Sequence, residues 1–258
     1  MAQSNQRRVL VTSALPYSNG RLHVGHIAGA YLPADIYVRY LRMKDVAVCF
    51  VCGSDDHGVA NIITAAEEGK HVREVAAYYN AKQREDFAGL GISFDVYGAT
   101  CANPYHKFAS QHFFMELYKK GYFEKRRTRQ FYDETRSMFL PDRFVKGVCA
   151  YCGTAEQNGD QCENCGEMLD VDTLKQARSV ISGTPAVVKE TVHWFLDLSR
   201  FQESVATWVE HADLRDHALN FVRKLLNQGL IKRCMTRDLD WGIPLPIDDP
   251  DAKGKVLY

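Results

Sequence analysis

The chain of 258 residues has no excess of charge, because 32 Lys and Arg residues balance 32 Asp and Glu residues. Zero net charge argues against a general polyanion binder, so any nucleic-acid contact would be a local patch. The sequence also has no internal repeat, no low-complexity tract and no run of about 18 apolar residues, and membrane association is therefore not expected. Residues 1–8 are polar and contain no apolar signal segment. This favours a cytoplasmic protein with reduced thiols.

The first 120 residues alternate between short apolar runs and amphipathic stretches, which predicts strands and helices in turn. The predicted strands are 8–13, 46–53 and 94–98, and the predicted helices are 24–43, 59–68, 72–89 and 104–120. This order predicts an α/β fold, the first half of a doubly wound parallel sheet of the Rossmann-like type. The run from Val46 to Cys52 should be buried on both faces, with Cys49 and Cys52 in the core.

Two closely spaced histidines open the first predicted helix. The loop before them reads Ala14-Leu15-Pro16-Tyr17-Ser18-Asn19-Gly20, and the helix begins with His23-Val24-Gly25-His26. Histidines three residues apart point the same way. The positive end of a helix attracts phosphate and disfavours protonated histidine, so neutral imidazoles there would donate to phosphoryl oxygens. Gly25 would leave room for a flat base or sugar. A zinc pair with a third ligand from elsewhere, or a plain helix surface, stays open.

A second polar loop, Gly53-Ser54-Asp55-Asp56-His57-Gly58, follows the second apolar run. Ligands of open α/β sheets bind beyond the carboxyl ends of the strands, so this loop and the histidine loop should converge. A carboxylate in this place can pair with a cation. Asp55 or Asp56 can instead cap the next helix, and both roles can coexist.

Four cysteines form two Cys-x2-Cys knuckles: Cys149, Cys152, Cys162 and Cys165. This spacing is typical of a structural zinc site, because four thiolates complete a tetrahedral ion and leave no open position. Two disulfides are the alternative, which a reducing compartment disfavours. Cys101 and Cys234 stand alone and carry no inference beyond packing.

The remainder of the chain changes in character from about Gly121. The segment from Lys119 to Arg129 is basic, which fits either a solvated surface at a helix end or an RNA contact. Residues 193–198 read as a strand, and helices are predicted near 200–210 and 213–228. In the second helix we expect Leu214, Phe221 and Leu225 to face inward and Gly229 to end it.

The histidine loop resembles that of the class I aminoacyl-tRNA synthetases, in the form used by the methionyl subfamily. The match lies in Ala14-Leu15-Pro16-Tyr17-x-Asn19-Gly20 and His23-Val24-Gly25-His26. Residues 53–58 resemble the family's Gly-Thr-Asp-Glu-His-Gly pattern, with Ser54 for threonine and Asp56 for glutamate. The resemblance extends through nearly the whole chain.

This resemblance implies an enzyme that activates methionine with ATP and Mg²⁺ as methionyl-adenylate and transfers the methionyl group to methionine tRNA. It implies catalytic roles for His23 and His26, a structural Zn²⁺ on the four cysteines, and Asp55 as the partner of the amino group of methionine. The further implied ligand residues are Tyr17, Asn19, Gly20, His23, Gly25 and His26 for ATP, and Ala14, Leu15, Tyr17 and Asp55 for methionine.

The resemblance also implies a division into three parts. Residues 1–120 would form the first half of the nucleotide-binding fold, 121–230 a connective-peptide insertion with the zinc knuckle, and 231–258 a return to the nucleotide-binding fold. The family's Lys-Met-Ser-Lys-Ser loop and anticodon-binding domain do not occur in these 258 residues, so we expect the chain to be a fragment that is inactive alone. The alternatives are a zinc-supported module that binds tRNA or a partner without catalysis, and another nucleotidyl transferase.

Overall fold

A computed structural model describes residues 8–257. The chain divides into two compact units, Met1–Phe108 and Ala109–Tyr258, and each is described by itself. No helix of the described part is long and apolar enough to cross a membrane.

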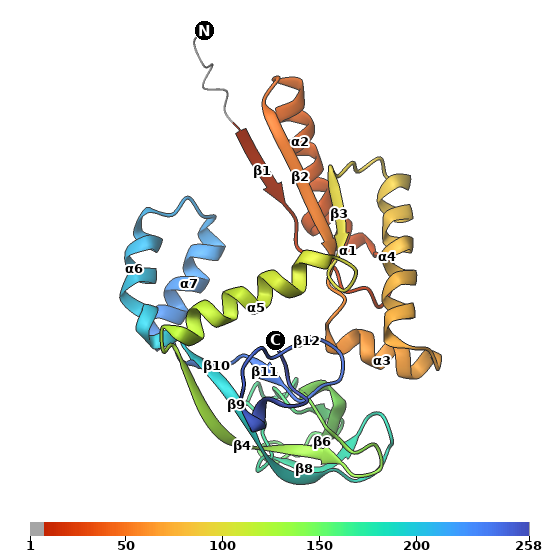
Figure 1. Cartoon of the computed structure of the whole chain (residues 1–258), viewed down its shortest axis with the longest axis vertical. Coiled ribbons are helices and arrows are strands. Elements are labelled where there is room, and N and C mark those ends of the chain that lie inside the picture. Colours follow the sequence, from red (N-terminus) through yellow and green to blue (C-terminus); the bar gives the residue numbers. More distant parts are fainter. Residues whose placement is uncertain (1–7, 258) are drawn as a thin grey trace. The chain divides into compact units, whose positions relative to one another are not determined.

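The first unit contains a parallel sheet in the order β1-β2-β3 (Figure 1). Its strands are β1 (Arg8–Thr12), β2 (Ala47–Ser54) and β3 (Val96–Ala99). Between β1 and β2 lie α1 (Val24–His26), the π-helical turn η1 (Ile27–Tyr31) and α2 (Leu32–Met43), and between β2 and β3 lie α3 (Val59–Glu68) and α4 (Val72–Gly89). Parallel strands joined by helices confirm the predicted α/β, Rossmann-like fold.

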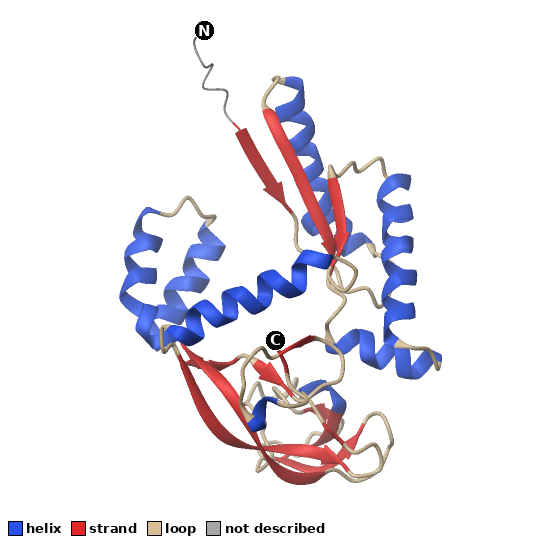
Figure 2. Ribbon diagram, in the orientation of Figure 1, coloured by secondary structure: helices blue, strands red, loops and turns tan. Residues whose placement is uncertain are grey.

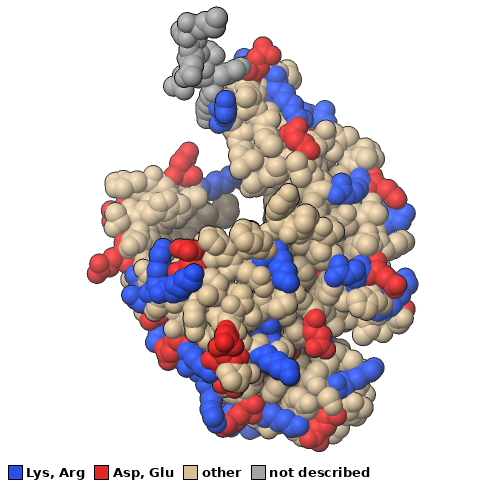
Figure 3. Space-filling view, viewed as in Figure 1, with Lys and Arg blue, Asp and Glu red and all other residues tan. Residues whose placement is uncertain are grey.

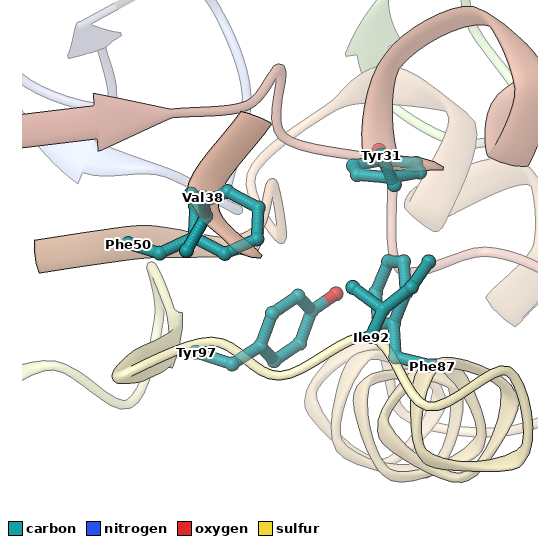
Figure 4. Close-up of a cluster of buried hydrophobic side chains, with 6 residues drawn as sticks. All are labelled: Tyr31, Val38, Phe50, Phe87, Ile92 and Tyr97. Atoms are coloured by element: carbon teal, nitrogen blue, oxygen red, sulfur yellow. The ribbon is translucent and has the colours of Figure 1, made fainter. Parts of the chain in front are cut away.

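The core of the first unit lies on one face of the sheet. Helices α2 and α4 supply Val38 and Phe87, which pack with Phe50 of β2 and Tyr97 of β3 (Figure 4). Each of these side chains is at most 9% exposed. Burying an aromatic or branched side chain of this kind contributes about 1.5–3 kcal/mol, so this cluster is a main source of stability for the unit.

The opposite face of the sheet is exposed. Leu10 and Val96 are 66% and 57% exposed, and Cys49, which lies beside Leu10 in the strand register, is exposed as well. The prediction that the second strand is buried on both faces is therefore wrong, as is the placement of Cys49 in the core. The reason is that α2 and α4 both pack on the face that carries Phe50 and Tyr97.

The second unit is built mainly from antiparallel strands, with an α-helical hairpin (Figure 2). Its long ribbon pairs β4 (Phe123–Asp133) with β9 (Val187–Asp197), and the sheet order is β10-β9-β4-β5. A second sheet has the order β7-β6-β8 and a third β11-β13-β12. The other strands are β5 (Met138–Phe139), β6 (Val145–Cys149), β7 (Gln157–Asn158), β8 (Leu174–Ser179), β10 (Lys232–Cys234), β11 (Thr236–Arg237), β12 (Ile243–Pro244) and β13 (Val256–Leu257).

The helices of the second unit agree with the predicted positions, but one predicted face does not. They are α5 (Pro104–Lys119, whose first residues belong to the first unit), α6 (Gln202–His211) and α7 (Asp216–Gln228), with short 3₁₀ turns η2 (Asp142–Phe144), η3 (Leu198–Phe201) and η4 (Pro250–Ala252). Helix α7 ends before Gly229, as predicted. Phe221 and Leu225, expected to face inward, are 62% and 38% exposed. That prediction is wrong, since the partly buried residues of α7 are Ala218, Leu219, Val222 and Leu226.

Strand pairing joins the last described residues to the second unit. β10 pairs with β9, and β11, β12 and β13 pair with one another, so none of the described strands after Gly229 pairs with β1, β2 or β3. The strand expected from Lys255 corresponds to β13, while Tyr258 lies outside the described residues. The division after Phe108 also comes earlier than the predicted boundary near residue 120.

A buried polar network fastens this last segment to β9. The carboxylate of Asp238 accepts hydrogen bonds from Thr191 Oγ1 (2.7 Å) and from Lys255 Nζ, and it lies 3.1 Å from Nε2 of the fully buried His193. Burial alone would raise the pKa of Asp238, but its bonds with His193, Lys255 and Thr191 hold it below its usual value. The buried charges are therefore paired, as burial requires.

Candidate functional site

The histidine loop and the loop of residues 53–58, called the Asp55 loop below, meet at the carboxyl ends of β1 and β2, as predicted. Tyr17 and Asp55 form an isolated parallel bridge. The Asp55 N–H donates to the Pro16 carbonyl (2.8 Å), and the Ser18 N–H donates to the Asp55 carbonyl (3.2 Å). The two loops are thus tied backbone to backbone, which fixes the side chains of Tyr17 and Asp55 on neighbouring segments.

Asp56 holds this junction together. Its carboxylate, which is fully buried, accepts hydrogen bonds from Ser18 Oγ (2.7 Å), Ser54 Oγ (2.6 Å) and the Cys101 N–H (2.9 Å). The three donors come from the histidine loop, the end of β2 and the segment after β3. Because charged hydrogen bonds of this kind are strong and a buried unpaired carboxylate is costly, Asp56 locks three segments into one arrangement.

Asp55 is the more accessible of the two carboxylates. It is partly buried, and within the described residues its carboxylate accepts one long hydrogen bond, from the His57 N–H at 3.4 Å. Burial raises the pKa of Asp55, because the charged form loses solvation that this single bond does not replace. A cation bound here would restore that stabilisation, so Asp55 suits a ligand ammonium group.

His23 and His26 cap their own helix reciprocally. His23 Nδ1 accepts from the His26 N–H (3.2 Å), and His26 Nδ1 accepts from the His23 N–H (3.3 Å). The rings are stacked with centroids 3.7 Å apart. Since each Nδ1 is an acceptor, a neutral ring carries its proton on Nε2. Burial, together with the neighbouring His23, lowers the pKa of His26. The pair therefore offers two Nε2–H donors at a helix N-terminus, the chemistry predicted for phosphate binding.

Two glycines make room for these side chains. A Cβ on Gly25 would lie 3.0 Å from Cε1 of His23, and a Cβ on Gly58 would lie 2.4 Å from Cε1 of Tyr17. The Tyr17 ring could not keep its place over any residue larger than glycine at position 58. Gly25 is exposed, and its missing side chain admits the His23 ring, which sequence reasoning did not foresee.

The other predicted ligand residues line the same loop and are open to solvent to different degrees. Leu15 and Tyr17 are 53% and 48% exposed and Ala14 is exposed, while Asn19 and Gly20 are partly buried. The Ala14 carbonyl accepts from the hydroxyl of the buried Tyr31 (2.9 Å). The loop is thus anchored from beneath while its side chains stay accessible.

Several buried polar residues that support the site were missed by the sequence reasoning. Asn61 of α3 donates to Ser18 Oγ and to the carbonyls of Asp55 and Asp56, and Gln83 of α4 donates to the carbonyls of Tyr17 and Gly20. The available signal was a polar residue on the inward face of a helix. In α4 the buried positions are Val75, Ala76, Asn80, Gln83 and Phe87, so two amides interrupt an apolar face.

The four cysteines cluster, as predicted, and all their Sγ atoms lie within 4.8 Å of one another. The sulfur atoms of Cys149 and Cys165 lie 3.8 Å apart, and those of Cys152 and Cys162 lie 3.6 Å apart. A disulfide has sulfurs about 2.0 Å apart, so these cysteines are free. In a tetrahedron with metal–sulfur distances of about 2.3 Å the sulfurs lie about 3.8 Å apart. The cluster therefore has the dimensions of a four-thiolate metal site.

The backbone of each knuckle repeats the same turn. Gly153 N–H donates to the Cys149 carbonyl and Gly166 N–H to the Cys162 carbonyl, both at 2.9 Å, and both glycines have positive φ (74° and 78°). The knuckle amides favour thiolates, and hydrogen bonds from Thr154 lower the pKa of Cys152 to about 5. The bond from the Glu167 amide lowers the pKa of Cys165, but the bonds with Cys162, Cys152 and Cys149 raise it to about 12. A cation among the four sulfur atoms would stabilise their thiolate forms.

The basic segment is not an open positive patch. From Phe123 onward it forms β4 rather than a helix end, and its cations lie beside carboxylates. Lys125 pairs with Asp249 and Asp251, Arg126 with Glu124, Arg127 with Glu190 and Arg129 with Asp172. On the face shown in Figure 3 blue and red side chains are likewise interspersed. These pairs favour the solvated-surface interpretation over an RNA contact along β4.

Comparison with known proteins agrees with this geometry. The family model described as "tRNA synthetases class I (M)" matches residues 9–258, and the chain belongs to this family. The methionine--tRNA ligase of Chloroherpeton thalassium is 47% identical over 257 residues, which cover 99% of this chain and 37% of that protein. The methionine--tRNA ligase of Pyrococcus furiosus is 44% identical over 251 residues, covering 97% and 34%. The chain spans about 37% of the length of curated relatives such as the Chloroherpeton protein.

A solved structure shares the fold. The Mycobacterium tuberculosis methionyl-tRNA synthetase in complex with methionyl-adenylate matches with a TM-score of 0.71 and 23% identity, over 98% of this chain and 44% of that one. The family match confirms the resemblance seen in the histidine loop and in residues 53–58, and the solved structure shows the same fold.

Proposed function

We propose that this chain takes part in the ATP-dependent activation of methionine and its transfer to tRNA, the reaction of a methionine--tRNA ligase. The observation that carries the proposal is the junction of the two loops, which places a weakly bonded carboxylate, Asp55, on a segment bridged to the loop that leads to two imidazole donors. The names of the relatives support it.

In this proposal the carboxylate of methionine attacks the α-phosphorus of ATP, which enters with Mg²⁺ as substrate. The bond from that phosphorus to the bridging oxygen breaks, and pyrophosphate leaves with the electron pair. His23 and His26 donate from Nε2 to phosphate oxygens on which charge develops, a contribution worth about 100- to 1,000-fold for each donor in comparable sites. The ribose hydroxyl of the terminal tRNA nucleotide then attacks the carbonyl carbon of the adenylate and releases AMP.

The remaining ligand residues have roles that follow from their positions. Asp55 holds the ammonium group of methionine, and Ala14, Leu15 and Tyr17 lie on the loop bridged to it, where their exposed side chains would meet the thioether. Asn19, Gly20 and Gly25 contact ATP beside the histidines. Because methionine lacks any strong polar handle on its side chain, discrimination by this pocket alone would reach about 1–3 kcal/mol.

We further propose that Cys149, Cys152, Cys162 and Cys165 hold one Zn²⁺ ion. The metal would supply a cross-link between the two knuckles and no reaction chemistry, since four protein ligands leave no open position. The sulfur spacing of 3.6 Å and 3.8 Å supports this assignment. Methionine tRNA as partner and the cytoplasm as location complete the proposal.

The test is methionine-dependent exchange of pyrophosphate into ATP. It is measured on the 258-residue chain and on a chimera in which these residues replace the matching part of the Chlorobaculum tepidum relative, which is 48% identical over 254 residues. Exchange by the chimera that stops when methionine is withheld supports the proposal. No exchange with a folded, metal-loaded chimera would instead favour a binding module.

A further inference from the structure

Gln83 of α4 is buried although it carries a polar side chain. It is 1% exposed and lies one turn before Phe87, whose ring belongs to the hydrophobic core. A buried amide is costly unless its hydrogen bonds are made. The partners of this amide therefore show what the position does.

The amide of Gln83 connects its own helix, α4, with the histidine loop and with β3. Its Nε2 donates to the Tyr17 carbonyl (2.8 Å) and to the Gly20 carbonyl (3.1 Å), and its Oε1 accepts from the Tyr97 hydroxyl (2.9 Å). Both amide hydrogens are thus used on the histidine loop, at the two ends of the turn Tyr17–Gly20. The third bond fixes the amide itself from β3.

The direction of these carbonyls sets the direction of the next amides. The described residues contain no cis peptide bond, and in a trans peptide the C=O and N–H groups point opposite ways. The Tyr17 carbonyl points to Gln83, and accordingly the Ser18 N–H points to the Asp55 carbonyl. By the same geometry, the bond from Gln83 to the Gly20 carbonyl turns the Arg21 N–H away from α4.

We propose that Gln83 is a positioning residue for the histidine loop. It pulls two carbonyls inward, so that the loop turns these oxygens away from the anionic substrate and the segment that leads to the histidines keeps its course. This inference rests on the proposed function. Gln83 itself touches no substrate, since the bonds of its amide all lie within the protein.

Three substitutions separate positioning from stability. Gln83→Leu removes both donors to the loop and the acceptor of Tyr97, while Tyr97→Phe removes the third bond alone and is the matched control. Gln83→Glu keeps the acceptor but can donate only when protonated. All are measured in the chimera at a temperature at which circular dichroism shows every variant to be folded.

We expect Gln83→Leu to lower kcat for pyrophosphate exchange by about 10- to 100-fold, because small displacements of binding groups have effects of this size. The KM for methionine should change less than about threefold, since the Asp55 N–H keeps its bond to the Pro16 carbonyl. Tyr97→Phe should stay within about twofold of the parent in kcat. The activity of Gln83→Glu relative to the parent should rise as the pH falls, because protonation restores a donor.

Equal kcat values for Gln83→Leu and Tyr97→Phe, or a flat pH dependence of the Gln83→Glu ratio, would overturn the proposal. Hydrogen exchange gives a readout that does not need activity. In the 258-residue chain the Ser18 N–H should exchange faster in Gln83→Leu than in Tyr97→Phe, and equal rates would contradict the positioning role. A parent chimera without exchange activity would refute the proposed function, while the hydrogen-exchange comparison would still decide on Gln83.

Discussion

The two candidate sites are held together in different ways. At the loop junction of the first unit, Asp56 is bonded to Ser18 and Cys101, which lie 38 and 45 residues away along the chain. At the knuckles of the second unit all four ligands fall within 17 residues, from Cys149 to Cys165, and the close sulfur pairs match a metal tetrahedron. The first site is assembled by folding alone, whereas the second, with the proposed Zn²⁺, would depend on a metal. The loop junction should survive chelation, and the cysteine cluster should survive substitutions in the hydrogen-bond network around Asp56.

The largest expected effect is the loss of metal from the second unit. Metal binding by four thiolates contributes on the order of 10 kcal/mol or more. We expect about one zinc ion per chain by elemental analysis, and Cys162→Ser should lose the metal and unfold the knuckle region locally. The nuclear magnetic resonance signals of the first unit should remain unchanged in this variant. Cys101→Ser is the control, which should keep the metal. A metal-free parent with Cys149 and Cys162 in disulfides would refute the assignment.

The next effect separates the two ligands of the first unit. In the chimera, Asp55→Ala should weaken methionine binding by about 2–5 kcal/mol and ATP binding much less, because an ammonium group loses its countercharge. His23→Ala or His26→Ala should slow adenylate formation by about 100- to 1,000-fold with nearly unchanged methionine affinity. Equilibrium binding measures the affinity for each ligand, and pyrophosphate exchange measures the rate of adenylate formation. Equal losses of both ligands in all three variants would indicate misfolding and remove the assigned roles.

A smaller effect tests the buried network itself. Asp56→Asn puts amide hydrogens where three donors meet, so the free energy of unfolding of the first unit should fall by about 3 kcal/mol. Urea denaturation measures it. Glu85→Gln, which removes an exposed pair with Lys82, is the control and should change stability by less than about 1 kcal/mol. If the two variants were equally stable, the junction would not depend on Asp56.

The smallest effect is the pH dependence that two groups of the first unit contribute to stability. The pKa of His26 is lower in the folded chain than its ordinary value, so below about pH 6.5 the unfolded chain binds more protons and stability falls. Asp55, whose pKa is raised, acts oppositely at lower pH, since the folded chain then holds the extra proton. Urea midpoints across this range measure both slopes. His26→Gln should reduce the fall in stability near pH 6. An unchanged slope of stability against pH would show that another group titrates there.

The same contrast explains what could be read from the sequence. The cysteine cluster depends on spacing within one short segment, so all four ligands could be named. The loop junction could be located, because apolar runs ending in Pro16 and Gly53 mark strand ends. Its supports could not, because Asn61 and Gln83 reach the histidine loop through bonds that span 43–66 positions, and a polar residue on an inward face does not show which segment it bonds. The exposed faces of Cys49 and Phe221 were missed for a related reason, since periodicity shows that a face is apolar but not what covers it.

The π-helical turn η1 has a consequence for how this segment can evolve. A π turn accommodates one residue more than an α-helix of the same length, and here it separates the histidines from α2. Deleting a residue such as Gly29, around which a Cβ would meet nothing within 4 Å, would restore regular helical winding. Because the π turn already absorbs one extra residue, the residues after it, including Tyr31, which donates to the Ala14 carbonyl, would stay nearly in phase with the histidines. A one-residue deletion at Gly29 should therefore be tolerated better than one within α2, which would put the two halves of the segment out of phase by about 100°.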